Sequence, residues 1–119
     1  MLGTEELSYK IKKYERLAEV ADLRVSILTL AAGVEVPWHR HSHVKDQFVC
    51  LEGPMQVDTR LPDEIKILEP GNTFEVPAGR PHRVTGVDDG PCRFLIIQGV
   101  GNYDFISCML ETISNLMPT

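Results

Sequence analysis

Apolar residues recur at every second position in several short stretches of the chain, which is the period of a β-strand with one buried face. Residues 22–31 carry Leu23, Val25 and Ile27 in this way, and residues 34–41 also alternate. Other short apolar runs end at strong turn signals such as Glu52-Gly53-Pro54. The pattern predicts strands at residues 22–31, 34–41, 48–51, 55–60, 64–68, 72–76, 81–86 and 92–99.

Turn signals separate these strands about every ten residues, the spacing expected of an all-β sandwich or barrel. Strands do not alternate with helical patterns, and no internal repeat stands out. The 119 residues are enough for one packed core and too few for two. We therefore expect one all-β domain over residues 1–119.

The two ends of the chain are harder to interpret. The first twenty residues suit a helix by composition, or a strand around residues 9–15, which read YKIKKYE. The tail, residues 107–117, has apolar residues at roughly helical spacing and predicts a short helix.

Composition and charge exclude some classes of function. The formal net charge of −5 argues against a nucleic-acid-binding protein, which needs clustered Lys and Arg. No apolar stretch is long enough to cross a membrane, and no signal peptide is visible. The odd count of three cysteines with no CxxC pair favours reduced thiols and a cytoplasmic location. Of these, Cys50 and Cys92 lie in apolar strand patterns and are expected to be small core residues.

The four histidines provide the candidate chemistry. His39 and His41 are two residues apart, so on a strand both imidazoles project to the same side. With His82 brought in from another strand, they would suit a divalent metal ion. Ordinary hydrogen-bonded histidines are the alternative, but the HxH pattern and the later PxGxxH turn favour the metal site.

Two stretches around these histidines resemble the motifs of the cupin family. In the first, Gly33 is followed after five residues by His39-Arg40-His41, then by Asp46 and Gly53. The second runs from Gly71 through Pro77-Ala78-Gly79 to His82 and Gly86. The spacings agree throughout and cover about residues 33–99. The resemblance implies a jelly-roll barrel, the double-stranded β-helix, with a conserved core at about 23–99. It also implies that His39, His41 and His82 hold one divalent metal ion (Fe, Mn, Ni or Zn).

The sequence departs from the family pattern at two positions. Gly86 stands where the family usually has Asn, and Asp46 stands where it usually has Glu. We expect Asp46 to be the fourth protein group, either as a direct ligand or through one bridging water. Gln47 and His43 are alternatives for this position, although strand parity points Gln47 away and a turn after His41 would remove His43 from the cluster.

The barrel interior beyond the metal ion would be the substrate pocket. Strand parity places Phe48 on the same face as Asp46, and the polar candidates are Arg60, Arg80, Arg93 and Gln98. Trp38 should face away from the metal ion.

The resemblance implies metal-dependent chemistry on a small oxygen-rich molecule, of dioxygenase, isomerase, decarboxylase or lyase type. The alternative is a non-enzymatic cupin that binds or senses a small ligand. The family also implies a homodimer, as does the unpaired strand edge expected at residues 9–15.

Overall fold

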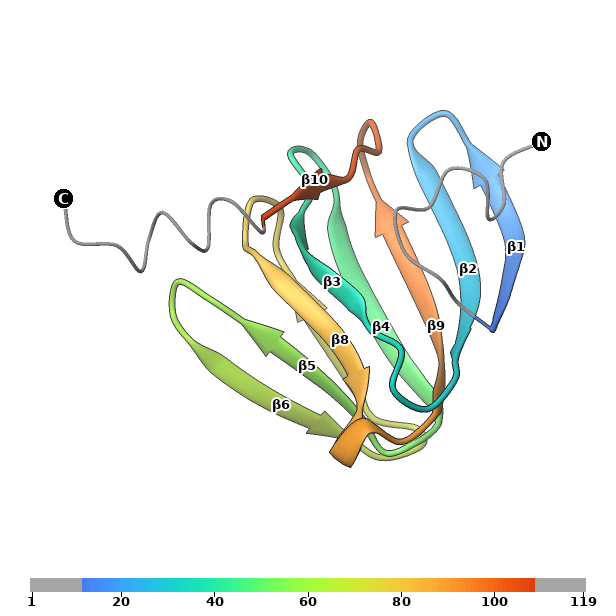
Figure 1. The fold of residues 1–119 in the computed structure, drawn as a ribbon. Coiled ribbons are helices and arrows are strands. Elements are labelled where there is room, and N and C mark those ends of the chain that lie inside the picture. The colour runs from blue at the N-terminus through green and yellow to red at the C-terminus, as the bar shows by residue number, and fades with distance from the viewer. Residues whose placement is uncertain (1–11, 109–119) are drawn as a thin grey trace, which may run out of the picture.

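The computed structural model describes residues 12–108, which form two five-stranded antiparallel sheets enclosing one core (Figure 1). One sheet has the order β1-β2-β9-β4-β7 and the other the order β10-β3-β8-β5-β6. The strands are β1 (Lys13–Val20), β2 (Leu23–Leu30), β3 (Val36–Arg40), β4 (Lys45–Glu52), β5 (Met55–Thr59), β6 (Glu64–Leu68), β7 (Thr73–Val76), β8 (His82–Gly86), β9 (Cys92–Gly99) and β10 (Ile106–Ser107).

Each stretch predicted as a strand coincides with one of the strands β2 to β9 over most of its length, which confirms the all-β fold. The prediction was too short for β4, whose inward-facing alternation begins at Asp46 and continues through Phe48 and Cys50. Within residues 12–108 the helical structure is limited to a 3₁₀ turn over Val87–Asp89, and no helix is long and apolar enough to cross a membrane.

The ends of the described chain resolve one prediction and correct another. The ambiguous amino-terminal segment contains a strand, β1, which pairs with β2. The helix predicted for residues 107–117 is not supported: Ser107 ends strand β10, and residues 109–119 lie outside the described part. Strand β10 was not predicted. It pairs Ile106 with Arg40 and so extends the second sheet beyond β3.

The core lies between the inner faces of the two sheets. Phe48 and Phe94 face each other with ring centroids 5.7 Å apart, and both are almost fully buried. Cys50 and Cys92 are buried in the same cluster as free thiols, as the sequence predicts. Burial raises the pKa of Cys92 to about 12, so this thiol stays protonated and acts as a small apolar side chain.

Strand β1 forms an edge of its sheet and is paired only with β2 among the described strands. Leu17 and Val20 on this strand are more than half exposed, at 54% and 62%. The homodimer stays a prediction, and this edge is where a second chain would cover apolar surface. Sedimentation equilibrium at micromolar concentration should give about twice the 13.4 kDa chain mass; a value near one chain mass would contradict it.

The structure explains why residue 86 is Gly where the family usually has Asn. Its backbone is ordinary extended chain, with φ −76° and ψ 153°, so the conformation does not require glycine. The loop that follows folds back over it instead. A Cβ atom at Gly86 would lie 1.8 Å from the carbonyl oxygen of Gly90, which leaves no room for a side chain.

Replacing Gly86 with Ala or Asn should therefore destabilise the protein, although Asn would restore the family residue. We expect the free energy of unfolding to fall by about 1–3 kcal/mol, the usual cost of overpacking. Urea denaturation with a chelator present measures this directly. The control is Thr85→Ala on the outward face of the same strand, expected to cost less than about 1 kcal/mol. Equal losses in the two variants would show that the close approach of Gly90 is not the cause.

Candidate metal centre

Four buried side chains from both sheets meet inside one end of the barrel. His39 on β3 lies opposite His82 on β8 in the strand register, and His41 follows the end of β3. Asp46 approaches from β4 in the other sheet. One potential ligand atom from each residue lies within 4.8 Å of the others. The structure thus brings together the four residues that the sequence predicts.

A backbone carbonyl oxygen fixes the orientation of each imidazole. The Nδ1 atom of His39 lies 2.7 Å from the carbonyl oxygen of Pro37, and that of His82 lies 2.9 Å from the carbonyl oxygen of Arg80. His41 Nδ1 contacts the carbonyl oxygen of Asp104. Because a carbonyl only accepts, each Nδ1–H donates, which leaves Nε2 as the basic atom of each neutral ring. Such anchoring is typical of metal-binding histidines.

Asp46 reaches the centre of the cluster despite its short side chain. Its Oδ2 atom lies 2.7 Å from His82 Nε2, 3.1 Å from His41 Nε2 and 3.9 Å from His39 Nε2. Atoms bound to one ion through bonds of about 2.1 Å lie roughly 3–4 Å apart. Its Oδ1 atom accepts a hydrogen bond from Gln98 Nε2 at 3.0 Å. Two of the three distances fall in this range and the third is slightly shorter, so the cluster is close to the arrangement of ligands around a single divalent ion, with Oδ2 as the atom that would face it.

The charge distribution of the cluster also suits a cation. Burial opposes ionisation of Asp46, but the imidazoles of His41 and His82 against its carboxylate hold its pKa well below the usual range. Burial and the neighbouring His82 lower the pKa of His39 to about 3, so that ring is neutral. Burial also opposes charging of His41, yet Asp46 outweighs it and raises the pKa of His41. One carboxylate and three imidazoles are ligands that Fe, Mn, Ni and Zn accept.

The two alternative residues for the fourth position lie outside the cluster. Gln47 points to the opposite face of β4, where its side-chain amide donates to Glu75 at 3.3 Å. His43 is exposed in the turn that follows His41. Among the three candidates, Asp46 is the one that lies with the histidines.

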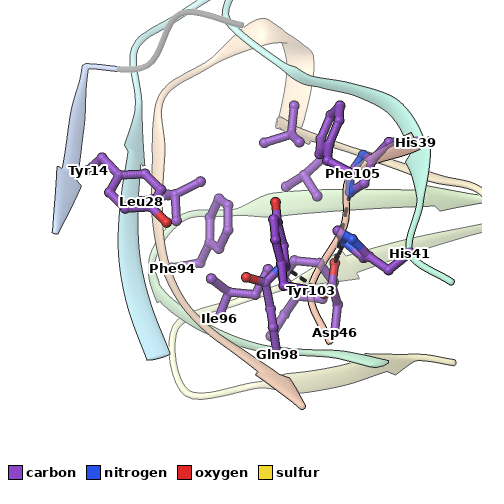
Figure 2. A pocket seen from close by; sticks show the side chains of 13 residues that line it. Tyr14, Leu28, His39, His41, Asp46, Phe94, Ile96, Gln98, Tyr103 and Phe105 are labelled. Atoms are coloured by element: carbon purple, nitrogen blue, oxygen red, sulfur yellow. Dashed lines mark hydrogen bonds and ion pairs between the residues drawn. The ribbon is translucent and has the colours of Figure 1, made fainter. Parts of the chain in front are cut away.

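A pocket adjoins the cluster, and Figure 2 shows the side chains around it. Of the five residues predicted to face a substrate, Phe48 and Gln98 line this pocket. The complete lining is Tyr14, Leu28, Val36, His39, His41, Asp46, Phe48, Val84, Phe94, Ile96, Gln98, Tyr103 and Phe105.

The three arginines proposed as substrate contacts lie away from this pocket. Arg60 stacks on Trp38, with its guanidinium carbon 4.2 Å from the ring centroid, and Trp38 faces away from the cluster as predicted. Arg80 donates to two backbone carbonyl oxygens around the β5–β6 turn. Arg93 pairs with carboxylates of β1 and β4 on the outer face of its sheet. None of the three arginines is therefore among the residues that line the pocket.

The loop between β9 and β10 contributes residues that the sequence analysis missed. Phe105 stacks on His39, with ring centroids 4.4 Å apart and an angle of 12° between the planes. The Tyr103 ring lies 5.3 Å from that of His41, and burial raises the pKa of Tyr103 to about 12. Asp104 anchors His41 through its carbonyl oxygen and accepts from the backbone of Ser42 at 2.8 Å. The one feature of the sequence that could have pointed to this loop is the pair of aromatic residues on either side of Asp104, just after the last predicted strand.

The hydrogen bond from Gln98 should matter for metal affinity, because it leaves Oδ2 of Asp46 directed at the ion. Gln98→Leu is expected to weaken divalent-metal affinity about 10- to 100-fold, the usual effect of losing such an outer contact. Competition with a chromogenic chelator measures the affinity. The matched control is Gln47→Leu on the neighbouring strand β4, opposite Ile97 and with its side chain on the outer face, which should bind metal as the unmodified protein does. An unchanged affinity in Gln98→Leu would contradict this role.

Comparison with known proteins agrees with the fold and the motifs. A family model described as "Cupin domain" matches residues 26–98, more than half of the chain. No curated protein matches the sequence.

Several solved structures share the fold at low sequence identity. A cupin-2 domain containing protein from Shewanella frigidimarina is 22% identical, with a TM-score of 0.61 over 76% of this chain and 82% of the other. A double-stranded beta-helix domain protein from Klebsiella pneumoniae is 20% identical, with a TM-score of 0.67 over 85% and 89%. Oxalate decarboxylase from Bacillus subtilis is 19% identical, with a TM-score of 0.65 over 82% of this chain and 26% of the enzyme. At these identities the likeness establishes the fold and not the reaction.

Proposed function

This chain belongs to the cupin family, and on that basis we propose that it is a metal-dependent enzyme acting on a small molecule that binds the metal ion through oxygen. The observation that carries the proposal is the arrangement of the cluster. Three imidazoles are each fixed at Nδ1 by a carbonyl, so that their Nε2 atoms and one oxygen of Asp46 point to a common centre.

The ion would be held by His39, His41 and His82 through Nε2 and by Asp46 through Oδ2. When bound, such an ion supplies Lewis-acid chemistry toward an oxygen ligand, or one-electron chemistry if it is redox-active. The protein's own contribution is to orient the ligands, to keep His39 neutral and to exclude water. Phe105 helps to exclude water, because its ring covers His39.

The adjoining pocket supports a role beyond metal storage. His39, His41 and Asp46 all line it, so a molecule in the pocket would lie beside the ion. The similar structures include a decarboxylase, and fold alone does not select a reaction among the cupin chemistries.

A non-enzymatic ligand-binding role is the second candidate, and one observation favours it. Apart from the cluster residues, the titratable side chains that line the pocket within residues 12–108 are Tyr14 and Tyr103. An enzyme of this kind would have few groups besides the metal ligands for moving protons.

The first experiment is elemental analysis of protein purified without a histidine tag. The proposal predicts about one equivalent of a transition metal per chain, removable by a chelator and restored by Fe, Mn, Ni or Zn. Protein that neither retains nor takes up such a metal would contradict it.

The second experiment separates enzyme from binder. The reloaded protein is incubated with small carboxylic acids and phenols, and consumption is followed by NMR spectroscopy and an oxygen electrode. Turnover that stops on chelation identifies an enzyme. Saturable binding without turnover of any compound that binds identifies the second candidate.

A further inference from the structure

The cavity beside the cluster is too small for an organic ligand in the conformation that the structure shows. Its volume is about 20 Å³. One water molecule needs roughly 10–15 Å³ of such space, so about one water-sized ligand fits beside the cluster. A molecule that binds the ion through oxygen, as the proposed function requires, is larger than this. Part of the wall must therefore move before such a molecule reaches the ion.

Most of the cavity wall is fixed by the two sheets. Lining side chains such as Phe48, Phe94 and Ile96 are buried and lie on β4 and β9, which pair with each other along their length. Moving any of them outward would break backbone hydrogen bonds of a sheet and open the core. The strands are therefore not the part of the wall that yields.

The loop between β9 and β10 is the part of the wall that can move. Tyr103 and Phe105 line the cavity from this loop, and Figure 2 shows both rings beside the cluster. No residue from Val100 to Phe105 is fully buried, and Val100 is 73% exposed. A segment with few buried contacts opens at a lower free energy than strands paired on both sides.

Individual contacts hold this loop closed. The amide of Gly101 donates to the carbonyl oxygen of Asp22 at 2.9 Å, and the amide of Ser42 donates to Oδ1 of Asp104 at 2.8 Å. The carbonyl oxygen of Asp104 also anchors Nδ1 of His41. Opening the loop would break these contacts together, so we expect the open state to be the minor one.

From these observations we infer that residues 100–105 form a gate over the metal site, and that the Phe105 ring sets the size of the ligand that reaches the ion. With this ring stacked on His39, 4.4 Å between centroids, the site accepts a water-sized ligand. A larger oxygen ligand binds once the loop has swung outward, so its apparent affinity is reduced by the fraction of molecules that are open. The inference rests on the proposed function, because the gate controls access to the ion.

The first test measures ligand affinity in full-length protein loaded with Co²⁺, whose visible absorption changes when a ligand binds the ion. The probes are fluoride, which is about the size of water, and acetohydroxamate, a larger oxygen chelator. Phe105→Ala should raise the affinity for acetohydroxamate about tenfold, because one aromatic stacking contact no longer holds the gate closed. The affinity for fluoride should change less than about twofold, because fluoride fits both states equally.

The control is Val100→Ala, which changes an exposed side chain of the same loop and should alter neither affinity. An unchanged affinity for acetohydroxamate in Phe105→Ala, or an equal rise for fluoride, would overturn the inference. A changed spectrum of the ligand-free Co²⁺ protein would also contradict it, because Phe105 would then shape the cluster instead of controlling access.

The variant Asp104→Ala tests whether the whole loop moves or only the Phe105 ring rotates. It removes the carboxylate that holds the Ser42 amide and keeps the backbone carbonyl that anchors His41. The affinity for acetohydroxamate should rise about fivefold, the usual effect of one hydrogen bond. An unchanged affinity would contradict a moving loop.

Amide hydrogen exchange in the metal-free protein tests the opening without any ligand. After correction for intrinsic rates, the amides of Ser42 and Gly101 should exchange at least about 100-fold faster than those of β9, which lies between β2 and β4. Both should exchange faster still in Phe105→Ala. Exchange as slow as that of β9 would show that the loop does not open separately.

The outcomes separate this inference from the proposed function. If Co²⁺ binds and His82→Ala abolishes that binding, while neither the probes nor the exchange shows the expected differences, the metal site stands and the gate is wrong. If Co²⁺ does not bind at the cluster, both fail.

Discussion

Replacing His82 with Ala is expected to lower the affinity for a divalent metal ion by at least about 100-fold, beyond the range seen when outer contacts of a metal site are lost. His82 is almost fully buried, and its Nε2 atom lies 2.7 Å from Asp46 Oδ2. Alanine removes one of four protein ligands, and no other described side chain reaches the place it leaves. Competition with a chelator, together with metal content after purification, measures the loss.

Two companion variants make this result specific. His43→Ala removes an exposed histidine outside the cluster and should leave the affinity unchanged. Asp46→Ala distinguishes direct ligation from a water-bridged contact. A loss as large as that of His82→Ala identifies a direct ligand, which the distances from Oδ2 to the imidazoles favour, whereas a loss of about 10- to 100-fold indicates a bridging water. Full metal occupancy in His82→Ala would show that the site is wrongly assigned.

Replacing Phe94 with Ala should have the largest effect on stability, lowering the free energy of unfolding by about 3–5 kcal/mol. The ring is fully buried in the middle of β9 and packs edge-to-face against Phe48 from β4. Truncation leaves a cavity that two paired strands cannot easily close, because their backbones are fixed by the sheet. Phe94 also forms part of the pocket wall, so the cavity would widen the pocket.

The measurement is urea denaturation of metal-free protein, so that metal binding does not contribute to the result. Phe94→Leu is the matched control and should cost less than about 1.5 kcal/mol, because it keeps most of the buried volume. A loss below about 1 kcal/mol in Phe94→Ala would contradict the core described above.

Local patterns in the sequence were enough to predict strands β2 to β9. Glycine and proline mark where strands end, and alternation predicts extended chain, but it does not identify the inner face of β2. Leu23, Val25 and Ile27 are only partly buried, whereas Leu28 and Leu30 face the core. The same rule places His39 and His41 on one face. It also separates Gln98, which shares the parity of Phe94, from Arg93, which does not. Arg93 was predicted as a substrate contact because of its charge, although its position in the strand places it on the outer face.

The missed features depend on contacts between distant parts of the chain. His41 is fixed by the carbonyl oxygen of Asp104, a residue 63 positions away, and no local pattern links the two. Tyr103 and Phe105 reach the cluster because β10 pairs with β3, and a two-residue strand has no readable periodicity. The exclusion of a side chain at Gly86 likewise results from how the next loop folds back, which spacing alone does not reveal.

The central claim is that His39, His41, Asp46 and His82 bind one divalent ion, and a crystal grown with Zn²⁺ tests it most directly. Data collected at the zinc absorption edge give an anomalous difference map that locates the metal without reference to the protein model. The account predicts one strong peak inside the barrel, about 2.0–2.2 Å from the three Nε2 atoms and from Oδ2 of Asp46. A barrel with no such peak, or a peak bound elsewhere, such as at the exposed His43, would contradict it.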